Sequence, residues 1–393
     1  MVEWKELGEL GKFENIGTDK KINEGEKLVT LLNYVDVYHH KYIDSSIPQM
    51  QVSASDKKIE DCTVEQGDLF VTPSSETVDD IGHASVITET IPNAVYSYHI
   101  MRYRMFEKNM LLSYYINYAF DTENVKKQIL KKAQGLTRFG LSKDKFASIR
   151  IPIPSLSEQT RIVGILDTFT ASIENLKKQI AERRKQYEHY RDQLLDLEGK
   201  EGVEMIPIKE VFDTRNGYTP STNNPQFWEN GTLPWFKMED IRDKGRILND
   251  SILHITPQAV KGKGLFKANS IILATSATIG EHALVSVEHL SNQRFTNFYP
   301  KKAYEDRINM KYVYYYMFVI DEWCKQHINQ GGFASVDMTG LYGLAFPVPT
   351  LEDQSRIVSI LDTFEASIQN LEAQLKQRQK QYEYYRNKLL TFD

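Results

Sequence analysis

One long amphipathic segment occurs twice in the chain, and this repeat constrains the possible folds more than any other feature. The first copy covers residues 151–195 and the second covers 346–390, at a constant offset of 195 residues. The two copies are identical at 27 of 45 aligned positions. Each copy has the apolar spacing of a long helix, so the chain is expected to contain two equivalent halves.

Both copies open with a helix start signal. In the first copy Ser155 follows a proline and precedes Glu158 by three positions, and Thr350 and Asp353 hold the same places in the second. This spacing predicts a capping box, in which the hydroxyl accepts from a free backbone amide and the carboxylate bonds back to the cap.

Beyond each start, apolar residues recur at alternating spacings of four and three, which is typical of the a and d positions of a coiled coil. Arg183 and Arg378 interrupt this seam at equivalent positions, and we expect them to extend out of it or to pair with carboxylates. The tyrosines are assigned to the seam rather than to a stacking surface for bases. The predicted seam consists of Ile162, Leu166, Phe169, Ile173, Leu176, Ile180, Tyr187, Tyr190, Leu194, Ile357, Leu361, Phe364, Ile368, Leu371, Leu375, Tyr382, Tyr385 and Leu389.

Chain connectivity predicts that the two helices pair antiparallel. A helix of about 40 residues is roughly 60 Å long, and a parallel pair would force the intervening segment to span that length. The predicted fold class is α+β: two α/β domains separated by an antiparallel two-helix coiled coil, with a pseudo-twofold internal repeat. The predicted parts are a domain over 1–150, a helix over 151–199, a domain over 200–346 and a helix over 347–393.

Inside the two domains, β-rich runs are expected at 27–38 and 67–72, and helices at 109–120, 124–134 and 311–326. The segments 67–87 and 269–287 correspond, as do 134–154 and 330–349, although their residues differ. Near-identical helices suit two copies of one partner. Divergent domains suit two different targets, such as the two half-sites of a duplex DNA sequence.

Composition limits the class of protein. Hydrophobic content of 41% and charged content of 26% are ordinary for a soluble globular protein. The sequence has no apolar run of 18 residues and no signal-peptide pattern, so we expect no membrane contact and a cytoplasmic location. The two cysteines fall in different predicted domains, so disulfides are not expected. A net charge of −5 means that DNA binding would need local basic groups or a partner that supplies them.

Motifs for catalysis are missing from the sequence. We find no phosphate-binding loop, dinucleotide fingerprint, zinc-ligand spacing or nucleophile elbow. Histidines such as His254, His282 and His289 have no ligand-type residues at metal-binding spacing, so neither a metal nor a catalytic residue is expected. This pattern favours a recognition or scaffold protein.

Candidate DNA-binding residues are those in loops that combine glycine, hydroxyl, basic and aromatic residues. Arg and Gln can contact base edges, while hydroxyls and backbone amides suit phosphates. The alternative is that these residues form ordinary turns and solvated surface. The candidates are Thr72, Ser74, Ser75, Gln134, Thr137, Arg138, Phe139, Lys143 and Lys145 in the first domain, and Tyr218, Thr219, Ser221, Lys237, Thr275, Ser276, Thr278, Gln293, Arg294, Gln330, Gly332, Phe333 and Ser335 in the second.

Three features carry a family resemblance: the duplicated blocks PIPSLSEQTRIVGILD and PVPTLEDQSRIVSILD, the GYTPS opening of the second domain, and the stretch LFKANSIILATSATIG. By these, and over essentially its whole length, the chain resembles the specificity subunit of type I restriction–modification systems. The first domain departs from the pattern, because it has KFENIGTDKK where a GxTPS motif would stand. Its DNA contacts are therefore not carried over from the family.

The resemblance implies two target-recognition domains, each reading one half of a bipartite double-stranded DNA sequence. It also implies that the helices set the spacer and dock two modification (methyltransferase) subunits, which bind S-adenosylmethionine. Restriction subunits with ATP-driven translocation can join that core. The chain itself would hold no cofactor and perform no catalysis. The main alternative is a coiled-coil scaffold joining two protein-binding domains; a second is a stand-alone DNA-modifying enzyme.

Overall fold

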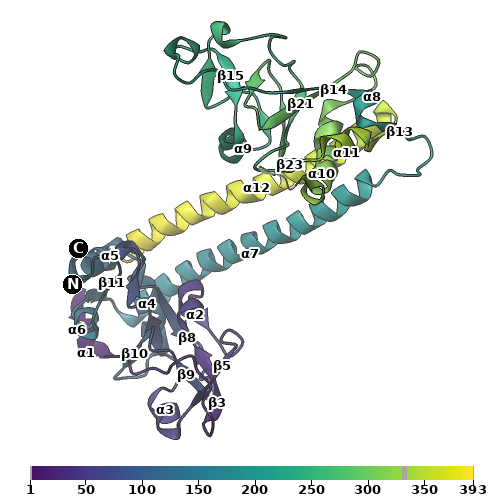
Figure 1. The fold of residues 1–393 in the computed structure, drawn as a ribbon. Helices are drawn as coiled ribbons and strands as arrows, with labels where there is room; N and C mark the ends of the chain where they lie inside the picture. The colour runs from purple at the N-terminus through teal and green to yellow at the C-terminus, as the bar shows by residue number, and fades with distance from the viewer. Residues whose placement is uncertain (1, 330–333, 393) are drawn as a thin grey trace. The chain divides into compact units, whose positions relative to one another are not determined.

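The computed structural model describes residues 2–329 and 334–392, which form two compact units. Unit 1 is Met1–Lys177 with Ala373–Asp393, and unit 2 is Lys178–Glu372. The long helices α7 (Leu156–Leu195) and α12 (Leu351–Leu389) each contribute one half to each unit (Figure 1). The two units divide both long helices near their midpoints, so this division does not test the domain boundaries predicted at 150, 199 and 346, which stay predictions.

Unit 1 contains a five-stranded and a three-stranded sheet. The larger sheet has the order β2 (Gly11–Glu14), β10 (Met101–Met105), β6 (Leu69–Val71), β8 (Ala84–Ile87), β4 (Tyr42–Ile43). The smaller has the order β5 (Met50–Ala54), β3 (Lys27–Leu32), β9 (Ala94–Tyr96). Helix α4 (Met110–Phe120), followed by α5 (Glu123–Lys132), packs on β8 and buries Tyr115, Ile116 and Phe120.

Unit 2 repeats this plan. Its larger sheet has the order β14 (Phe212–Asn216), β21 (Phe295–Pro300), β18 (Ser270–Ala274), β19 (His282–Val285), β16 (Ile247–Leu248). Its smaller sheet has the order β17 (Leu253–Ile255), β15 (Leu233–Phe236), β20 (Leu290–Ser291), and α10 (Met310–Gln326) takes the place of α4. In both units the last strand of the larger sheet, β4 or β16, is parallel to its neighbour. The predicted internal repeat is confirmed and extends through both domains.

A further two-stranded ladder precedes each long helix. It pairs β1 (Glu3–Glu6) with β12 (Arg150–Ile153) in unit 1, and β13 (Glu204–Pro207) with β24 (Ala345–Val348) in unit 2. Each ladder therefore joins the start of a domain to its end, directly before the helix. No helix in the described part of the chain is long and apolar enough to cross a membrane.

The predicted β-rich run over 27–38 is wrong in its second half. Strand β3 ends at Leu32, and helix α2 (Tyr34–His39) follows. Asn33 stops the strand because its side chain accepts from the Val35 amide at 2.9 Å, while the Asp36 carboxylate accepts from the Asn33 amide at 2.9 Å. This capping box outweighs the β preference of the Tyr and Val residues that follow.

The long helices pair antiparallel within each unit, as predicted. In unit 1, Phe169 near the start of α7 stacks on Tyr385 near the end of α12, with ring centroids 5.4 Å apart. In unit 2, Tyr190 near the end of α7 stacks on Phe364 near the start of α12, at 5.3 Å. These aromatic pairs occupy the predicted seam positions, but the tyrosine of each pair stays partly in solvent: Tyr385 is 41% exposed and Tyr190 44%.

The two arginines that interrupt the seam differ from expectation. Arg378 lies over the ring of Phe169 at 5.6 Å, and Arg183 lies over the ring of Phe364 at 5.8 Å. A guanidinium over an aromatic face is attracted by the ring quadrupole and covers the ring with its stem. The arginines therefore pack on seam aromatics rather than leaving the seam.

Both helix starts form the hydroxyl half of the predicted capping box. The Ser155 hydroxyl accepts from the Glu158 amide at 3.4 Å, and the Thr350 hydroxyl accepts from the Asp353 amide at 3.2 Å. The Glu158 carboxylate bonds Arg161 at 2.6 Å instead of returning to the cap. An arginine one turn along the helix thus competes for the carboxylate.

A buried glutamine completes each helix start. The side-chain amides of Gln159 and Gln354 each donate to the carbonyl of the proline before the helix, at 2.9 Å in both units. Both side chains are almost fully buried, at 3% and 0% exposure. Since a buried amide must be hydrogen-bonded, this contact explains why glutamine stands at the same place in both copies.

Candidate nucleic-acid interface

In unit 1 the structure brings two of the predicted loops together. Strand β7 (Ser74–Ser75) pairs with β11 (Phe139–Gly140), so that Ser75 faces Phe139. The Arg138 guanidinium donates to the Ser74 hydroxyl at 3.3 Å. We call residues 72–75 and 134–140 the unit 1 edge. It places an arginine and hydroxyl groups on one exposed surface, although they lie about sixty residues apart in the sequence.

The loop over 134–140 is a tight hairpin. Gln134 and Gly140 exchange backbone hydrogen bonds of 3.0 and 2.8 Å. Gly135 has φ +141°, and a Cβ atom there would lie 2.0 Å from the Arg138 carbonyl oxygen. The turn therefore requires glycine. It leaves Leu136 96% exposed at the tip, beside exposed Thr137.

Sequence reasoning did not select Leu136. Its only signal was its position in a glycine-containing turn between two selected residues, Gln134 and Thr137. An apolar side chain this exposed is available to contact a partner, and apolar side chains are used as wedges between base steps.

Three other unit 1 candidates are placed differently. Thr72 is fully buried, and its hydroxyl accepts from the His83 amide at 3.0 Å. The Lys145 ammonium donates to the Lys132 carbonyl at 2.8 Å and so completes the end of α5. These two residues have structural roles. Lys143 is exposed at the start of α6 (Lys143–Ala147).

In unit 2 the corresponding loops also meet. Ser276 forms a β-bridge with Ser335, and the Thr275 amide donates to the Arg294 carbonyl at 3.0 Å. The Thr219 hydroxyl donates to the Gln293 side chain at 2.5 Å. We call residues 219, 275–278, 292–294 and 335 the unit 2 edge. Its exposed members include Thr219, Gln293 and Arg294.

Several unit 2 candidates hold the domain together. Thr275 is 8% exposed, and its hydroxyl bonds that of Thr296 at 2.9 Å. The Tyr218 hydroxyl donates to the Ala259 carbonyl at 3.0 Å and accepts from the Lys261 amide at 2.7 Å.

The remaining unit 2 candidates have mixed placements. The Lys237 amide donates to Asp240 at 2.8 Å, and its side chain is half-buried. Thr278 is half-buried, and Ser221 is exposed with its carbonyl accepting from the Trp228 indole. The predicted residues Gln330, Gly332 and Phe333 lie outside the described residues.

The opening of the first domain lacks the GxTPS motif but contains a glycine, Gly17, that is equivalent to Gly217. A Cβ atom on Gly217 would lie 2.1 Å from the Ser291 carbonyl oxygen, and one on Gly17 would lie 2.4 Å from the Ser97 carbonyl carbon. The two glycines allow the same close approach of two backbones, so IGTDKK is the counterpart of NGYTPS. The residue after Ser97 is Tyr98, whose side chain is 47% exposed.

Tyr98 and His99 are further candidates that the sequence did not single out. Their ring centroids lie 4.0 Å apart, and both side chains are exposed. His99 follows Ser97 by two positions, as Gln293 follows Ser291 in unit 2. Comparison of the two halves at Gly17 and Gly217 would have found them.

Alanine at either glycine is expected to distort the backbone that it approaches, at Ser97 in unit 1 and at Ser291 in unit 2. Gly17→Ala and Gly217→Ala should each destabilise their unit by about 1–3 kcal/mol, because the new Cβ meets rigid backbone. Thermal unfolding measures the loss, and hydrogen exchange locates it near Ser97 or Ser291. Gly164→Ala is the control, since its Cβ meets nothing within 4 Å on α7 and alanine favours helix. Equal unfolding temperatures for all three variants would contradict the assigned role.

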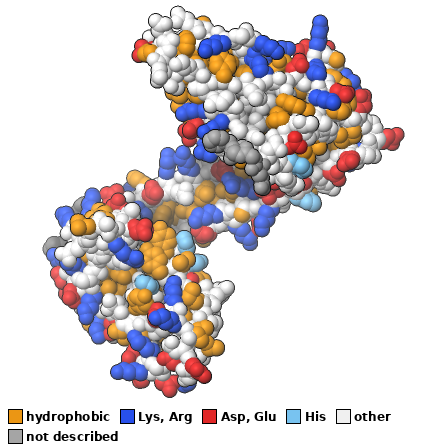
Figure 2. Space-filling model, viewed as in Figure 1, with side chains coloured by type: hydrophobic (Ala, Val, Ile, Leu, Met, Phe, Trp, Pro, Cys, Tyr) orange, Lys and Arg blue, Asp and Glu red, His pale blue; other side chains and the backbone are white. Residues whose placement is uncertain are grey.

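Charge is mixed over both units. In the face shown in Figure 2, Lys and Arg side chains are interspersed with Asp and Glu over each unit. The edges therefore offer individual cations such as Arg138 and Arg294 rather than a broad basic surface. Within residues 2–329 and 334–392, no three His, Cys, Asp or Glu side chains are grouped to hold a metal ion.

Comparisons with known proteins point to one family. The sequence profile of the type I restriction modification DNA specificity domain matches residues 1–183 and 200–380. The chain is 48% identical over 214 residues to the EcoprrI type I restriction enzyme specificity subunit of Escherichia coli, covering 52% of this chain and 53% of that protein.

Another relative and a solved structure agree with this match. The Escherichia coli EcoR124I/EcoR124II specificity subunit is 37% identical over 268 residues, covering 63% of this chain and 64% of that protein. The chain thus spans about half to two thirds of the length of these two relatives. The alignment with a solved structure of the type I R-M system covers 100% of this chain and 98% of that chain. The TM-score is 0.64 and the sequence identity is 16%, so the two chains share a fold.

Proposed function

Because the chain belongs to the family of the type I restriction modification DNA specificity domain, we propose that it is the DNA-reading subunit of a type I restriction–modification complex. Each unit would read one half of a bipartite sequence in double-stranded DNA. The observation that carries this proposal is the pair of edges. In each, two loops far apart in the sequence are bridged, Ser75 to Phe139 in unit 1 and Ser276 to Ser335 in unit 2, and the exposed side chains differ.

The exposed side chains of the two edges suit direct reading of bases. Unit 1 presents Arg138 with Leu136 and Thr137, and unit 2 presents Gln293 and Arg294 with Thr219. Arginine can bond guanine and glutamine can bond adenine through two atoms each in the major groove. Different side chains on one framework would give each unit its own half-site.

The helices supply the second part of the proposal. Their near-identical sequences present similar surfaces in units 1 and 2, which suits two copies of one partner. We assign that partner as the modification (methyltransferase) subunit, which would bind S-adenosylmethionine and supply phosphate-binding charge. Restriction subunits would join the same complex, and this chain would contribute recognition without catalysis.

Salt-dependent DNA binding tests the proposal directly. The full chain, mixed with a type I methyltransferase subunit, should bind one split sequence tightly, and its log affinity should fall linearly with log salt as counterions are released. Binding without sequence preference, or no binding with stable protein–protein complexes, would favour the scaffold alternative. Methylation by the isolated chain would instead favour a stand-alone enzyme.

Single arginine variants should separate the two half-sites. Arg138→Ala is expected to weaken discrimination at one position of one half-site by about 1–3 kcal/mol, and Arg294→Ala should do the same in the other half-site. Competition binding with single-base variants of each half-site measures both effects. A uniform loss over all sequences would place these arginines on phosphates, and no loss would remove the edges from the interface.

A further inference from the structure

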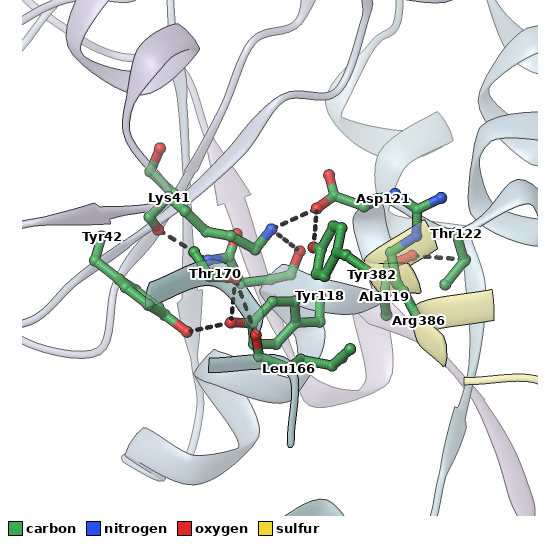
Figure 3. Close-up of polar contacts among 12 residues, drawn as sticks. Lys41, Tyr42, Tyr118, Ala119, Asp121, Thr122, Leu166, Thr170, Tyr382 and Arg386 are labelled. Atoms are coloured by element: carbon green, nitrogen blue, oxygen red, sulfur yellow. Dashed lines mark hydrogen bonds and ion pairs between the residues drawn. The ribbon is translucent and has the colours of Figure 1, made fainter. Parts of the chain in front are cut away.

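Each recognition domain contacts both long helices through a cluster of charged and aromatic side chains. In unit 1 this cluster centres on Asp121, directly after α4 (Figure 3). The Lys41 ammonium lies 2.6 Å from the Asp121 carboxylate, and the Tyr382 hydroxyl of α12 donates to the same oxygen at 3.5 Å. With Arg386, one turn further along α12, these residues form what we call the Asp121 cage.

Charge holds the Asp121 cage together. Burial raises the pKa of Asp121, but the ion pair and hydrogen bond with Lys41 and the charge of Arg386 outweigh burial and leave that pKa below its usual value. Asp121 is therefore ionised at neutral pH. Beside it, the Tyr118 hydroxyl of α4 donates to Asp167 of α7 at 2.6 Å, so the domain contacts both helices.

Unit 2 has the same anchor on α12. The Tyr315 hydroxyl of α10 donates to Asp362, which occupies the repeat position of Asp167. Three residues after Tyr315 stands Phe318, just as Asp121 stands three residues after Tyr118. Phe318 therefore takes the place of the carboxylate.

The cations around Phe318 are also equivalent. Arg191 is the repeat partner of Arg386, at the offset of 195 residues. Arg246 corresponds to Lys41, because the backbone carbonyl of each accepts a hydrogen bond from the neighbouring strand of the larger sheet. The Leu284 amide donates to the Arg246 carbonyl at 2.9 Å, and the Val86 amide donates to the Lys41 carbonyl at 3.0 Å. Arg246 and Arg191 lie 5.1 and 4.9 Å from the Phe318 ring centroid. We call Arg191, Arg246 and Phe318 the Phe318 cage.

We infer that Asp121 and Phe318 are positioning residues that fix each recognition domain on its helix pair. Asp121 does so through its ion pair with Lys41, and Phe318 through cation–π contacts with Arg191 and Arg246. Arg246 is also paired with Asp321 at 3.3 Å. Each cage reaches the long helix that does not directly follow its domain in the chain: α12 for unit 1 and α7 for unit 2. The consequence for DNA reading, a fixed direction of each edge, rests on the proposed function.

Hydrogen exchange on the full chain tests the inference. Asp121→Ala should speed exchange about tenfold or more in residues 378–389 of α12, since it removes the ion pair with Lys41 and the hydrogen bond from Tyr382, and should leave unit 2 unchanged. Phe318→Ala should do the same for the end of α7. Glu107→Ala, which removes an exposed carboxylate just before α4, is the control for charge.

A double variant tests whether an aromatic ring can replace the carboxylate in the Asp121 cage. K41R/D121F places an aromatic ring beside two arginines, as in the Phe318 cage, but supplies no counterpart of Asp321, so exchange in 378–389 should return part of the way to that of the wild type. Raising the salt from about 0.05 to about 0.5 M should speed exchange at the wild-type cage and affect the double variant less. If K41R/D121F exchanges as fast as Asp121→Ala, or if Asp121→Ala matches Glu107→Ala, the inference is overturned.

A DNA measurement separates positioning from simple stability. In complex with the methyltransferase subunit, Asp121→Ala should lose about tenfold of its preference for the correct spacing over spacings changed by one base pair. Base preferences within each half-site should not change. Altered base preferences with intact spacing would contradict the positioning role. If the wild-type chain reads no DNA while the exchange results hold, the proposed function fails and the cages stand.

Discussion

Removing one heptad from each long helix is expected to shorten the spacer between the two DNA half-sites by about three base pairs. Seven helical residues are about 10 Å long, and base pairs are stacked about 3.4 Å apart. The stacked pairs Phe169–Tyr385 and Tyr190–Phe364 have the same antiparallel register. In that register, residues 174–180 of α7 match residues 374–380 of α12. Deleting both segments keeps the heptad phase and leaves the Asp121 and Phe318 cages intact.

Under the proposed function, the methyltransferase complex that contains the deletion variant should methylate a site with the shortened spacer and lose about a hundredfold or more of its activity at the original spacing. Losing one half-site removes several base contacts, each typically about 1–3 kcal/mol. Methylation of DNA sets with graded spacers measures the shift. Deleting only 174–180 is the control, because it breaks the facing register and should abolish activity at every spacing. An unchanged spacer in the double deletion would contradict a role of the helices in spacing.

Acid is expected to destabilise unit 2 through His289. Burial lowers the pKa of His289 to about 4, against hydrogen bonds with Val287 and Asn297 that raise it. The ring is fully buried between Phe236 and Phe266, at centroid distances of 5.4 and 5.5 Å. The folded protein therefore holds a neutral imidazole where the unfolded chain would bind a proton.

The sign follows from the two pKa values. The unfolded chain takes up a proton near its usual pKa of about 6.5 and the folded chain only near 4, so unfolding binds protons between them and stability falls as the pH falls. The loss between pH 7 and pH 4 should approach about 3 kcal/mol. Denaturant unfolding of a Trp4→Phe background, followed by tryptophan fluorescence, reports on unit 2, which holds the other three tryptophans, Trp228, Trp235 and Trp323.

His289→Gln is the test variant and His254→Gln, at a half-buried position in the same unit, is its control. The His289 variant should be less stable at pH 7 but lose less stability on acidification than the wild type. The control should keep the full acid effect. Equal pH dependence in the wild type and in His289→Gln would show that another group is responsible.

The helical framework was predictable because its signal is local and repeated. Heptad spacing, helix starts and chain connectivity gave both long helices and their antiparallel direction. The domain repeat was also visible, as the correspondence of 67–87 with 269–287 became the β6–β8 and β18–β19 pairs. The strand expected over 33–38 failed because the cap at Asn33 depends on a few side-chain hydrogen bonds that β propensity does not describe.

The edges and cages were less accessible from sequence because they depend on long-range pairing. Ser75 and Phe139 were selected separately, yet nothing in either loop specifies that they face each other. Gly17 was overlooked because the search was for a TPS motif, whereas the backbone requires only the glycine. Asp121 and Phe318 share no chemistry, and their equivalence emerges only from the anchors at Tyr118 and Tyr315.

Mapping DNA methylation across the host genome, with the chain co-expressed with its neighbouring genes, is the most direct test of DNA reading by this chain. We expect one split motif with a fixed gap, which disappears without the chain and loses discrimination in one half with Arg138→Ala and in the other half with Arg294→Ala. Methylation that is the same with and without this chain would contradict DNA reading and favour a scaffold.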